Sequence, residues 1–190
     1  MDKKLSGMSL DELWKLFPIY LTKHNENWAA WYAEEELLLK EYLPANQVAR
    51  ISHIGSTAVK EIWAKPTIDI LVEVLHECDL QQFKPILTEA GYLCMSESSG
   101  RLSFNKGYTE NGFAERVFHL HLRRNGDNDE LYFRDYLNTY PDVAKEYEKL
   151  KLSLRKAYEH NRDGYTEGKT AFVEEYTRKA KIEFKNRYIL

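Results

Sequence analysis

The chain has 190 residues, of which 43% are hydrophobic and 13% aromatic, and its formal charge is −3. These values predict an ordered globular protein and exclude a disordered chain. The slight negative charge argues against an extended nucleic-acid surface, because such a surface needs many basic contacts to phosphates. No stretch approaches the ~20 apolar residues of a membrane helix, so we expect no membrane association and a cytoplasmic location. The two cysteines, Cys78 and Cys94, lack metal-site or redox spacing, and we expect reduced structural thiols.

Two helices and a strand are expected before residue 55. Ser9 and Glu12 have the spacing of a capping box, which predicts a short helix. Apolar residues at helical spacing predict an amphipathic helix over residues 25–42, with tryptophans in the core and glutamates in solvent. We expect the first strand over residues 47–54.

A turn of small residues follows this strand. Gly55 lets the backbone turn sharply and lets a ligand approach closely, because glycine has no Cβ. The hydroxyls of Ser56 and Thr57, with the N–H groups that follow, would form a concavity suited to phosphate oxygens. The next strand, over residues 67–74, carries Asp69, a hard oxygen ligand for a divalent ion. The sequence therefore predicts phosphate together with a metal.

Alternation along this second strand places Asp69, Leu71 and Glu73 on one face and isoleucines and valines on the other. We expect the isoleucines and valines to pack in the core. Glu73 lies ~13 Å from Asp69 on an extended strand, too far to share one ion. We therefore expect Glu73 at the surface or at the end of the strand.

The clearest alternation in the chain is VFHLHL, over residues 117–122, which predicts a strand with His119 and His121 on one face. Histidines two residues apart on a strand lie ~6.6–6.8 Å apart along it, so both rings can lean toward one ion. If a neighbouring strand presents Asp69, these side chains suit Zn²⁺, Mn²⁺, Fe²⁺ or Ni²⁺ better than Mg²⁺, which prefers oxygen ligands. The alternative is two partly exposed histidines without a ligand.

Other elements complete the expected fold. A helix over residues 80–90 and strands over residues 92–95 and 101–105 precede VFHLHL, and helices over residues 129–138, 141–160 and from 165 onward follow it. This order predicts an α+β fold with helices on one side of a mixed sheet. We divide it into a core over residues 1–125 and a helical part over residues 126–190, or one continuous domain.

Four motifs in this order resemble the GrpB family, within the polymerase-β-like nucleotidyltransferase superfamily: HIGSTAV with KPTIDIL, then HLHL, FRDYL and YTEGKTAF. The resemblance covers about residues 27–180. It implies a nucleotidyltransferase-like mixed sheet flanked by helices, with Asp69 as the catalytic carboxylate. Leu71 stands where the superfamily has its second carboxylate, and the HLHL strand stands where the third is expected.

The resemblance also implies a ligand, namely a nucleoside triphosphate or another phosphorylated small molecule, with a divalent metal (Mg, Mn or Zn). The reaction would be transfer of a nucleoside monophosphate to an unknown acceptor. Lys65 and Arg123 flank the strands of Asp69 and the histidines, and Lys169 falls near the start of the last helix, so we expect these three to bind phosphate. Two alternatives remain: a catalytically degenerate module that binds a nucleotide or phospho-ligand, and a metal-dependent hydrolase.

Overall fold

One five-stranded sheet runs through the centre of the fold, and the computed structural model describes residues 7–98 and 100–189 around it. In spatial order the strands are β1 (Val48–Ile54), β2 (Ile68–Val74), β5 (Gly112–Arg124), β4 (Arg101–Thr109) and β3 (Leu93–Ser98). Strands β2 and β5 are parallel, whereas every other neighbouring pair is antiparallel. The sheet is therefore mixed.

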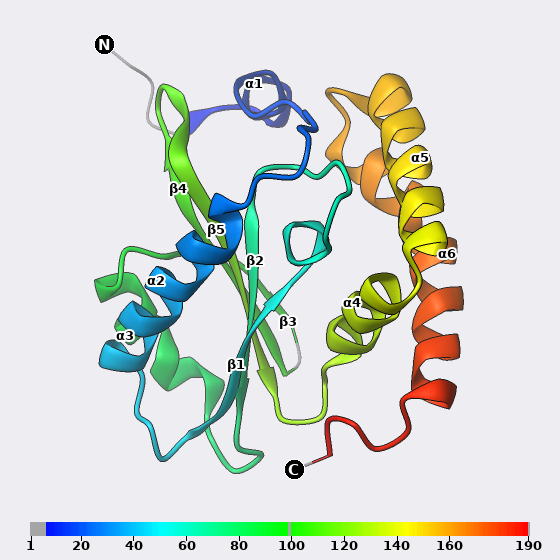
Figure 1. Cartoon of the computed structure of the whole chain (residues 1–190). Coiled ribbons are helices and arrows are strands. Elements are labelled where there is room, and N and C mark those ends of the chain that lie inside the picture. The colour runs from blue at the N-terminus through cyan, green and yellow to red at the C-terminus, as the bar shows by residue number, and fades with distance from the viewer. Residues whose placement is uncertain (1–6, 99, 190) are drawn as a thin grey trace.

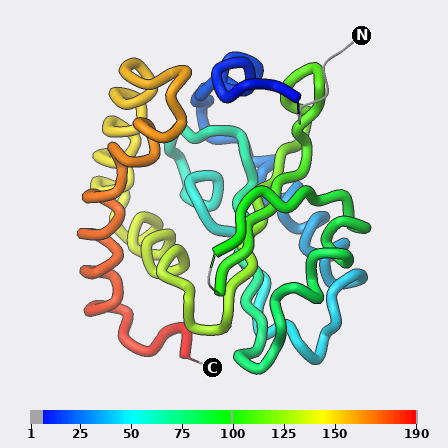
Figure 2. Tube along the Cα trace, turned by 180° about the vertical axis from the view of Figure 1, so that it is seen from behind, coloured from blue at the N-terminus to red at the C-terminus, as the bar shows by residue number. Residues whose placement is uncertain are grey.

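Helices cover both faces of this sheet, as Figure 1 shows. On one face lie α2 (Asn27–Tyr42) and α3 (Phe83–Glu89), and on the other α4 (Asp129–Thr139), α5 (Pro141–Tyr158) and α6 (Arg162–Glu183). The view from behind shows the same three layers (Figure 2). The expectation of helices on one side only is wrong, because the C-terminal helices form a layer of their own.

The expected α+β class is confirmed: a mixed sheet is flanked by helices and followed by a helical C-terminal part. The capping box of Ser9 and Glu12 opens α1 (Leu10–Leu16), as predicted. Strands β4 and β5 are longer than predicted, because pairing of Tyr108 with Phe113 continues their hairpin. The division at residue 125 stays a prediction.

The larger core lies between the sheet and helices α2 and α3. Ile68, Ile70, Val72 and Val74 of β2 pack there with Trp28, which confirms both the predicted strand face and the predicted core role of this tryptophan. The opposite face of β2 is also covered: a smaller cluster joins Leu71 to Ile54 and Leu131. Both faces of β2 are therefore buried, which the alternation alone does not indicate.

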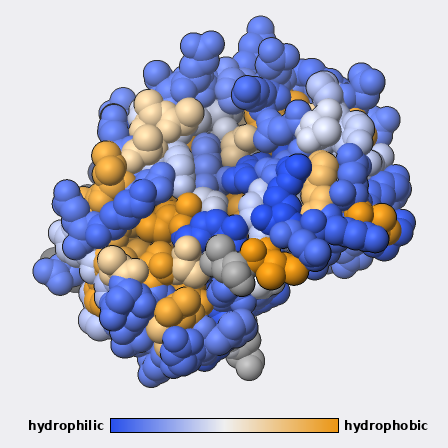
Figure 3. Space-filling model, turned by 60° about the horizontal axis from the view of Figure 1, so that its bottom comes forward, coloured by the Kyte–Doolittle hydropathy of each residue, from blue (hydrophilic) through white to orange (hydrophobic). Residues whose placement is uncertain are grey.

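The surface of the molecule carries both hydrophobic and hydrophilic side chains. On the face shown in Figure 3, apolar atoms gather in patches between hydrophilic ones. Within the described part of the chain, no helix is both long enough and apolar enough to cross a membrane. Both cysteines are free thiols, but Cys94 is exposed, so only the buried Cys78 has the expected structural position.

Two glutamates expected in solvent or at a strand end are buried instead. Glu35 of α2 accepts hydrogen bonds from the Tyr92 hydroxyl at 2.9 Å and from Lys106 Nζ at 2.8 Å. The side chain of Glu73 is 0% exposed and accepts from Arg50 Nε at 2.6 Å. A buried carboxylate needs such partners to offset its lost hydration.

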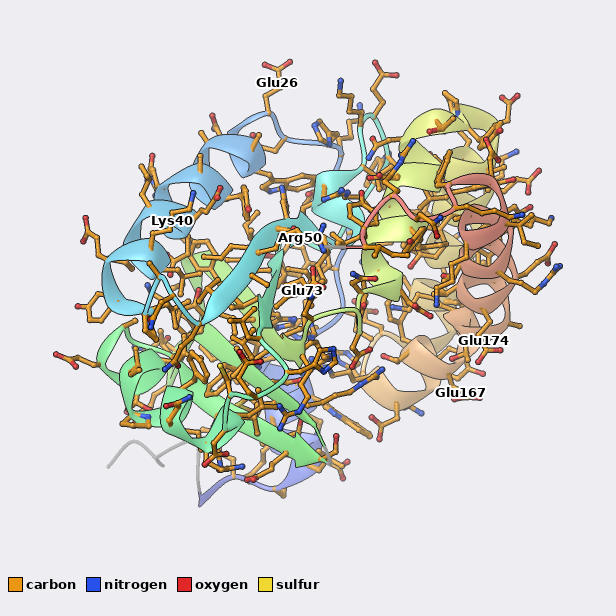
Figure 4. All side chains as sticks on the ribbon, turned by 90° about the horizontal axis from the view of Figure 1, so that it is seen from below. Glu26, Lys40, Arg50, Glu73, Glu167 and Glu174 are labelled. Carbon is orange, nitrogen blue, oxygen red and sulfur yellow. The ribbon has the colours of Figure 1, made fainter. Side chains whose placement is uncertain are left out.

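The ion pair of Arg50 and Glu73 lies inside the fold. Figure 4 shows the two side chains together near the centre, whereas Glu26 and Lys40 on one side and Glu167 and Glu174 on the other lie at the outside. The backbone N–H of Gly126 and the amide of Asn128 also donate to Glu73, at 3.0 and 2.9 Å. Glu73 therefore joins β1 and β2 to the loop that leads into α4.

The turn after β1 requires a glycine because it passes directly over Asp69. Gly55 has φ +70°, a conformation that other residues rarely adopt. A Cβ at this position would overlap the Oδ2 atom of Asp69 and lie 2.9 Å from its Cβ. The register pairs Ile54 with Asp69, so this close approach follows directly from the antiparallel pairing of β1 and β2.

We expect Glu73→Ala to lower the free energy of unfolding by about 3 kcal/mol, because removal of one partner leaves a partly buried guanidinium unpaired. Urea unfolding followed by circular dichroism measures this loss. The control is Glu175→Ala, which breaks an exposed pair with Lys179 on α6. Loss of such a pair should cost much less than loss of the buried pair. Equal effects of the two substitutions would contradict the importance of the buried pair.

We expect Gly55→Ala to destabilise the fold by about 2–5 kcal/mol, because the new methyl group meets the Asp69 carboxylate in addition to the strain at positive φ. The matched control is Gly126→Ala, since Gly126 has φ +88° and no heavy atom within 4 Å of an added Cβ. That variant should lose only about 1–2 kcal/mol of the free energy of unfolding, which is the cost of placing alanine at a positive φ. Thermal and urea unfolding of both variants measure the difference, and similar losses would show that Asp69 tolerates the methyl group.

Candidate functional site

Asp69, His119 and His121 come together, as predicted, because β2 and β5 lie side by side. The parallel register places Asp69 opposite His119 and Leu71 opposite His121. The Nδ1 atom of His119 is 3.3 Å from Asp69 Oδ1, and the Nε2 atom of His121 is 3.8 Å from the same oxygen. Both rings thus face one carboxylate oxygen.

The remaining nitrogen of each ring faces another protein group. His119 Nε2 is 2.8 Å from the Tyr108 hydroxyl, and His121 Nδ1 is 3.3 Å from an Arg123 nitrogen. Arginine only donates hydrogen bonds, so His121 Nδ1 must accept. The other ring nitrogen, His121 Nε2, faces Asp69 and can donate to it.

The charges of this cluster follow from burial and hydrogen bonding. Burial alone would raise the pKa of Asp69, but hydrogen bonds and charge from His119 and His121 hold that pKa well below its usual range. Burial lowers the pKa of His119, although Asp69 acts in the opposite direction. At neutral pH Asp69 is therefore ionised and His119 is neutral.

This arrangement does not fit a metal ion. Among residues 7–98 and 100–189, no three His, Cys, Asp or Glu side chains are grouped so that they could hold one. A ligating histidine nitrogen needs a free lone pair, and each ring nitrogen of His119 and His121 faces another protein group. Leu71, two residues after Asp69 on β2, is 0% exposed and offers no oxygen ligand. The predicted metal ligands form a hydrogen-bonded cluster instead.

Beside Asp69 lies a small pocket of about 160 Å³ with basic walls. Its basic residues come from three parts of the chain: Lys65 precedes β2, Lys151 belongs to α5, and Arg162 and Lys169 lie in the first turns of α6. We call this space the cationic pocket. Lys65 and Lys169 were predicted to bind phosphate, and this pocket is where the structure places them.

A larger cavity of about 840 Å³ adjoins the cationic pocket. It lies between the sheet and the C-terminal helices, and its apolar walls include Val59, Phe133, Leu137, Tyr147 and Val173. Gly55 lines it as well, and Ser56, Asp69 and Lys169 line both spaces. The two spaces therefore meet at the Gly-Ser turn and at Asp69.

Thr57, predicted to bind phosphate, is not available to a ligand. Its buried hydroxyl donates to the carbonyl oxygen of Thr67 at 3.1 Å and lies 2.9 Å from His53 Nε2. Burial lowers the pKa of His53 to about 4, so this ring is neutral at neutral pH. We infer that His53 Nε2 carries the ring proton and donates it to the Thr57 hydroxyl oxygen, because the hydroxyl proton is already donated to the Thr67 carbonyl. Thr57 therefore fixes the turn rather than an anion.

Arg123, also predicted to bind phosphate, faces the interior of the sheet. Its guanidinium is buried and donates to the carbonyl oxygens of Leu102 and Leu122 at 3.1 and 3.2 Å. Arg123 lines neither the cationic pocket nor the larger cavity. Its contact with the site is indirect, through the His121 ring.

Helices α4 and α5 hold the segment between β1 and β2 in place. Arg134 of the FRDYL motif donates to the carbonyl oxygen of His53 at 2.7 Å. On α5, Lys151 Nζ donates to the Trp63 carbonyl at 2.5 Å and Glu148 accepts from the Trp63 N–H at 2.6 Å. The Gly-Ser turn and the segment after it are thus fixed from the helical side.

Sequence reasoning missed Lys151 and Arg162. The buried residues of α5 are Ala144, Tyr147 and Lys151, which follow helical spacing along one stripe. A lysine on the apolar stripe of a helix is therefore the signal that pointed to this site. Arg162 gave no such signal, since it begins α6 and is exposed.

Two curated proteins are similar in sequence to this chain over most of its length. The glutamate-rich protein GrpB of Alkalihalophilus pseudofirmus is 41% identical over 164 residues, which cover 83% of this chain and 92% of that protein. The UPF0157 protein YqkA of Bacillus subtilis is 33% identical over 97% of this chain and 54% of its own length.

Among solved structures, the conserved protein GrpB from Enterococcus faecalis aligns with a TM-score of 0.74 and 31% identity, over 87% of this chain and 99% of that one. An alignment to the Cid1 poly(U) polymerase reaches only 13% identity and a TM-score of 0.49, over 84% and 51% of the two chains, and carries no argument about function. The model of the family described as GrpB protein matches residues 18–179. The chain therefore belongs to the GrpB family.

Proposed function

We propose that this protein binds a nucleoside triphosphate, or another phosphorylated small molecule, across the two adjoining spaces. The phosphates would lie in the cationic pocket and the rest of the ligand in the larger cavity. The observation that carries this proposal is that Ser56, Asp69 and Lys169 line both spaces, so one molecule can occupy them together.

The cationic pocket has the chemistry of a phosphate site. Lys65, Lys151 and Lys169 can each present an ammonium group, and Arg162 a guanidinium, to phosphate oxygens. The Ser56 hydroxyl adds a neutral donor at the turn where the sequence predicts one. These groups come from the β1–β2 segment and from two helices, so the folded chain assembles the site.

The larger cavity has the size and walls of a site for an organic group. Its volume of about 840 Å³ lies within the ~300–1,000 Å³ typical of small-molecule sites. Phe133 and Tyr147 line it with flat aromatic faces, and Val59 and Val173 add aliphatic ones. A nucleobase with its sugar, or another ring of similar size, can pack against such walls.

Nucleotidyl transfer is the reaction that this arrangement supports. An acceptor hydroxyl would attack the α-phosphorus, forming a new P–O bond and breaking the bond to the departing pyrophosphate. The proton of that hydroxyl would pass to water. Cations of the pocket would stabilise the charge that develops on that pyrophosphate. We give Asp69 an orienting role, because a carboxylate with so low a pKa is a weak base. No step is assigned to the divalent metal expected from the sequence.

A second candidate is a module that binds the same ligand without turnover. The observation that favours it is Leu71, which is fully buried where the resemblance implies a carboxylate. Product formation from α-labelled nucleoside triphosphate separates the two candidates. For the metal-dependent hydrolase, residues 7–98 and 100–189 contain no group of three side chains that could hold a metal ion.

We expect Lys169→Met to weaken nucleotide binding by about 10- to 100-fold, because one charge-assisted hydrogen bond to phosphate is lost. Calorimetric titration of ATP, GTP, CTP and UTP measures this. The control is Lys149→Met, since Lys149 is exposed on α5 and lines neither space. Lys149→Met should bind like the unaltered protein. Unchanged affinity in Lys169→Met, or no binding of any of the four nucleotides, would contradict the proposed site.

We also expect nucleotide affinity to fall as pH rises from about 6 to about 9. Burial lowers the pKa of Lys151 to about 7, with Lys169 lowering it further and Glu148 opposing. Burial lowers the pKa of Lys65 to about 8, with Arg162 and Lys169 adding to the shift and Asp69 opposing. Both lysines therefore lose their protons across this range, and with them their attraction for phosphate.

A bound anion should raise both lysine pKa values again, so binding should take up protons near pH 8. Calorimetry in two buffers with different ionisation enthalpies measures that uptake. Lys151→Met should retain only part of it, because Lys65 remains. An affinity that is flat across this pH range would show that these lysines do not contact the ligand.

A further inference from the structure

The cationic pocket carries an excess of positive charge that the described residues do not balance. Lys65, Arg162 and Lys169 form no ion pair with any carboxylate in residues 7–98 and 100–189. Lys151 is 2% exposed and donates only to the carbonyl oxygen of Trp63 among these residues. Lys106, whose side chain is 26% exposed, has a carboxylate partner in Glu35.

The basic groups of the pocket are also close enough to repel one another. Arg162 and Lys169 both lower the pKa of Lys65, and Lys169 lowers that of Lys151. Holding like charges together in a partly dehydrated space costs free energy, which a multiply charged anion would recover on binding. The pocket is therefore complementary to a ligand with several negative charges.

Among the residues that the structure describes, Asp69 is the only carboxylate lining the cationic pocket, and its charge is already engaged. Its Oδ1 atom faces His119 and His121, and its Oδ2 atom lies against the backbone of Gly55. A metal ion that bridged Asp69 to a phosphate would have to displace these contacts and approach the surrounding lysines. Leu71 offers no second oxygen to hold such an ion.

We propose that the cationic pocket binds the phosphate chain of its ligand as the free polyanion, with Lys65, Lys151, Arg162 and Lys169 in place of a divalent ion. The inference rests on the proposed function, since it assumes a phosphorylated ligand. A magnesium ion on a polyphosphate removes two negative charges and adds a cation beside four others. The complex with magnesium should therefore bind more weakly than the free anion.

The volume of the cationic pocket indicates how many phosphate groups of the ligand it holds. At about 160 Å³ the cationic pocket has room for a group larger than a water molecule, such as one phosphate with its oxygens. The next phosphate would then lie at the wall formed by Ser56 and Lys169, which the larger cavity shares. The ligand class is thus a di- or triphosphate.

The test is calorimetric titration of inorganic tripolyphosphate and of ATP into the full chain, once with a chelator and once with excess Mg²⁺. We expect both to bind in the chelator, about tenfold more tightly than with Mg²⁺. Equal affinity in the two conditions overturns this inference, because the four cations would then not disfavour the metal. Binding that appears only with Mg²⁺ overturns this inference and leaves the proposed function intact. No binding of ATP in either condition overturns the proposed function itself.

Two variants sharpen the result. Asp69→Asn removes the one carboxylate but keeps an oxygen that can accept from His119, so tripolyphosphate affinity in the chelator should rise severalfold. A metal bridge would instead require Asp69, and loss of binding in this variant overturns the inference. Lys65→Met should weaken binding by about tenfold or more in the chelator. Far-UV circular dichroism and thermal unfolding check that both variants remain folded.

Discussion

Asp69 is held between the backbone of Gly55 and the rings of His119 and His121, and the cleft is arranged around that contact. The antiparallel pairing of β1 with β2 brings the turn over the carboxylate, and the parallel pairing of β2 with β5 brings the histidines beside it. Glycine is required because any side chain would enter the space of the carboxylate. Both strand pairings therefore have to be in register before this arrangement can form.

The helical layer completes the cleft by binding the segment between the two strands. Arg134 donates a hydrogen bond to the carbonyl of His53, just before the Gly-Ser turn. Lys151 donates one to the carbonyl of Trp63, near the end of the segment between β1 and β2. The same Lys151 lines the cationic pocket, so one side chain both anchors α5 and supplies charge to the site. The position of Lys169 on α6 depends in turn on the packing of α6 against α4 and α5. The charge arrangement is therefore a property of the whole fold.

How much the sequence could predict depends on the range of the interactions involved. The alternation of VFHLHL defined which face carries His119 and His121, and β-strand geometry is local enough for that prediction to hold. Thr57 and Arg123 each donate to a buried backbone carbonyl, a partner that the spacing of residues does not reveal. Glu73 was misplaced because its burial depends on α4 and its preceding loop, far along the chain. Lys151 could have been predicted only by noticing a charged residue on the otherwise apolar stripe of α5.

The cationic pocket is costly for the free protein. Lys151 has its pKa lowered from an ordinary value of 10.5 to about 7, so between these values the unfolded chain binds the additional proton. Stability contributed at this residue therefore rises with pH across that interval and is lost as pH falls toward 7. An apolar side chain on the same stripe of α5 would avoid that cost. A buried lysine that opposes folding at neutral pH, yet lines a pocket with three other cations, is what a site adapted to an anion requires.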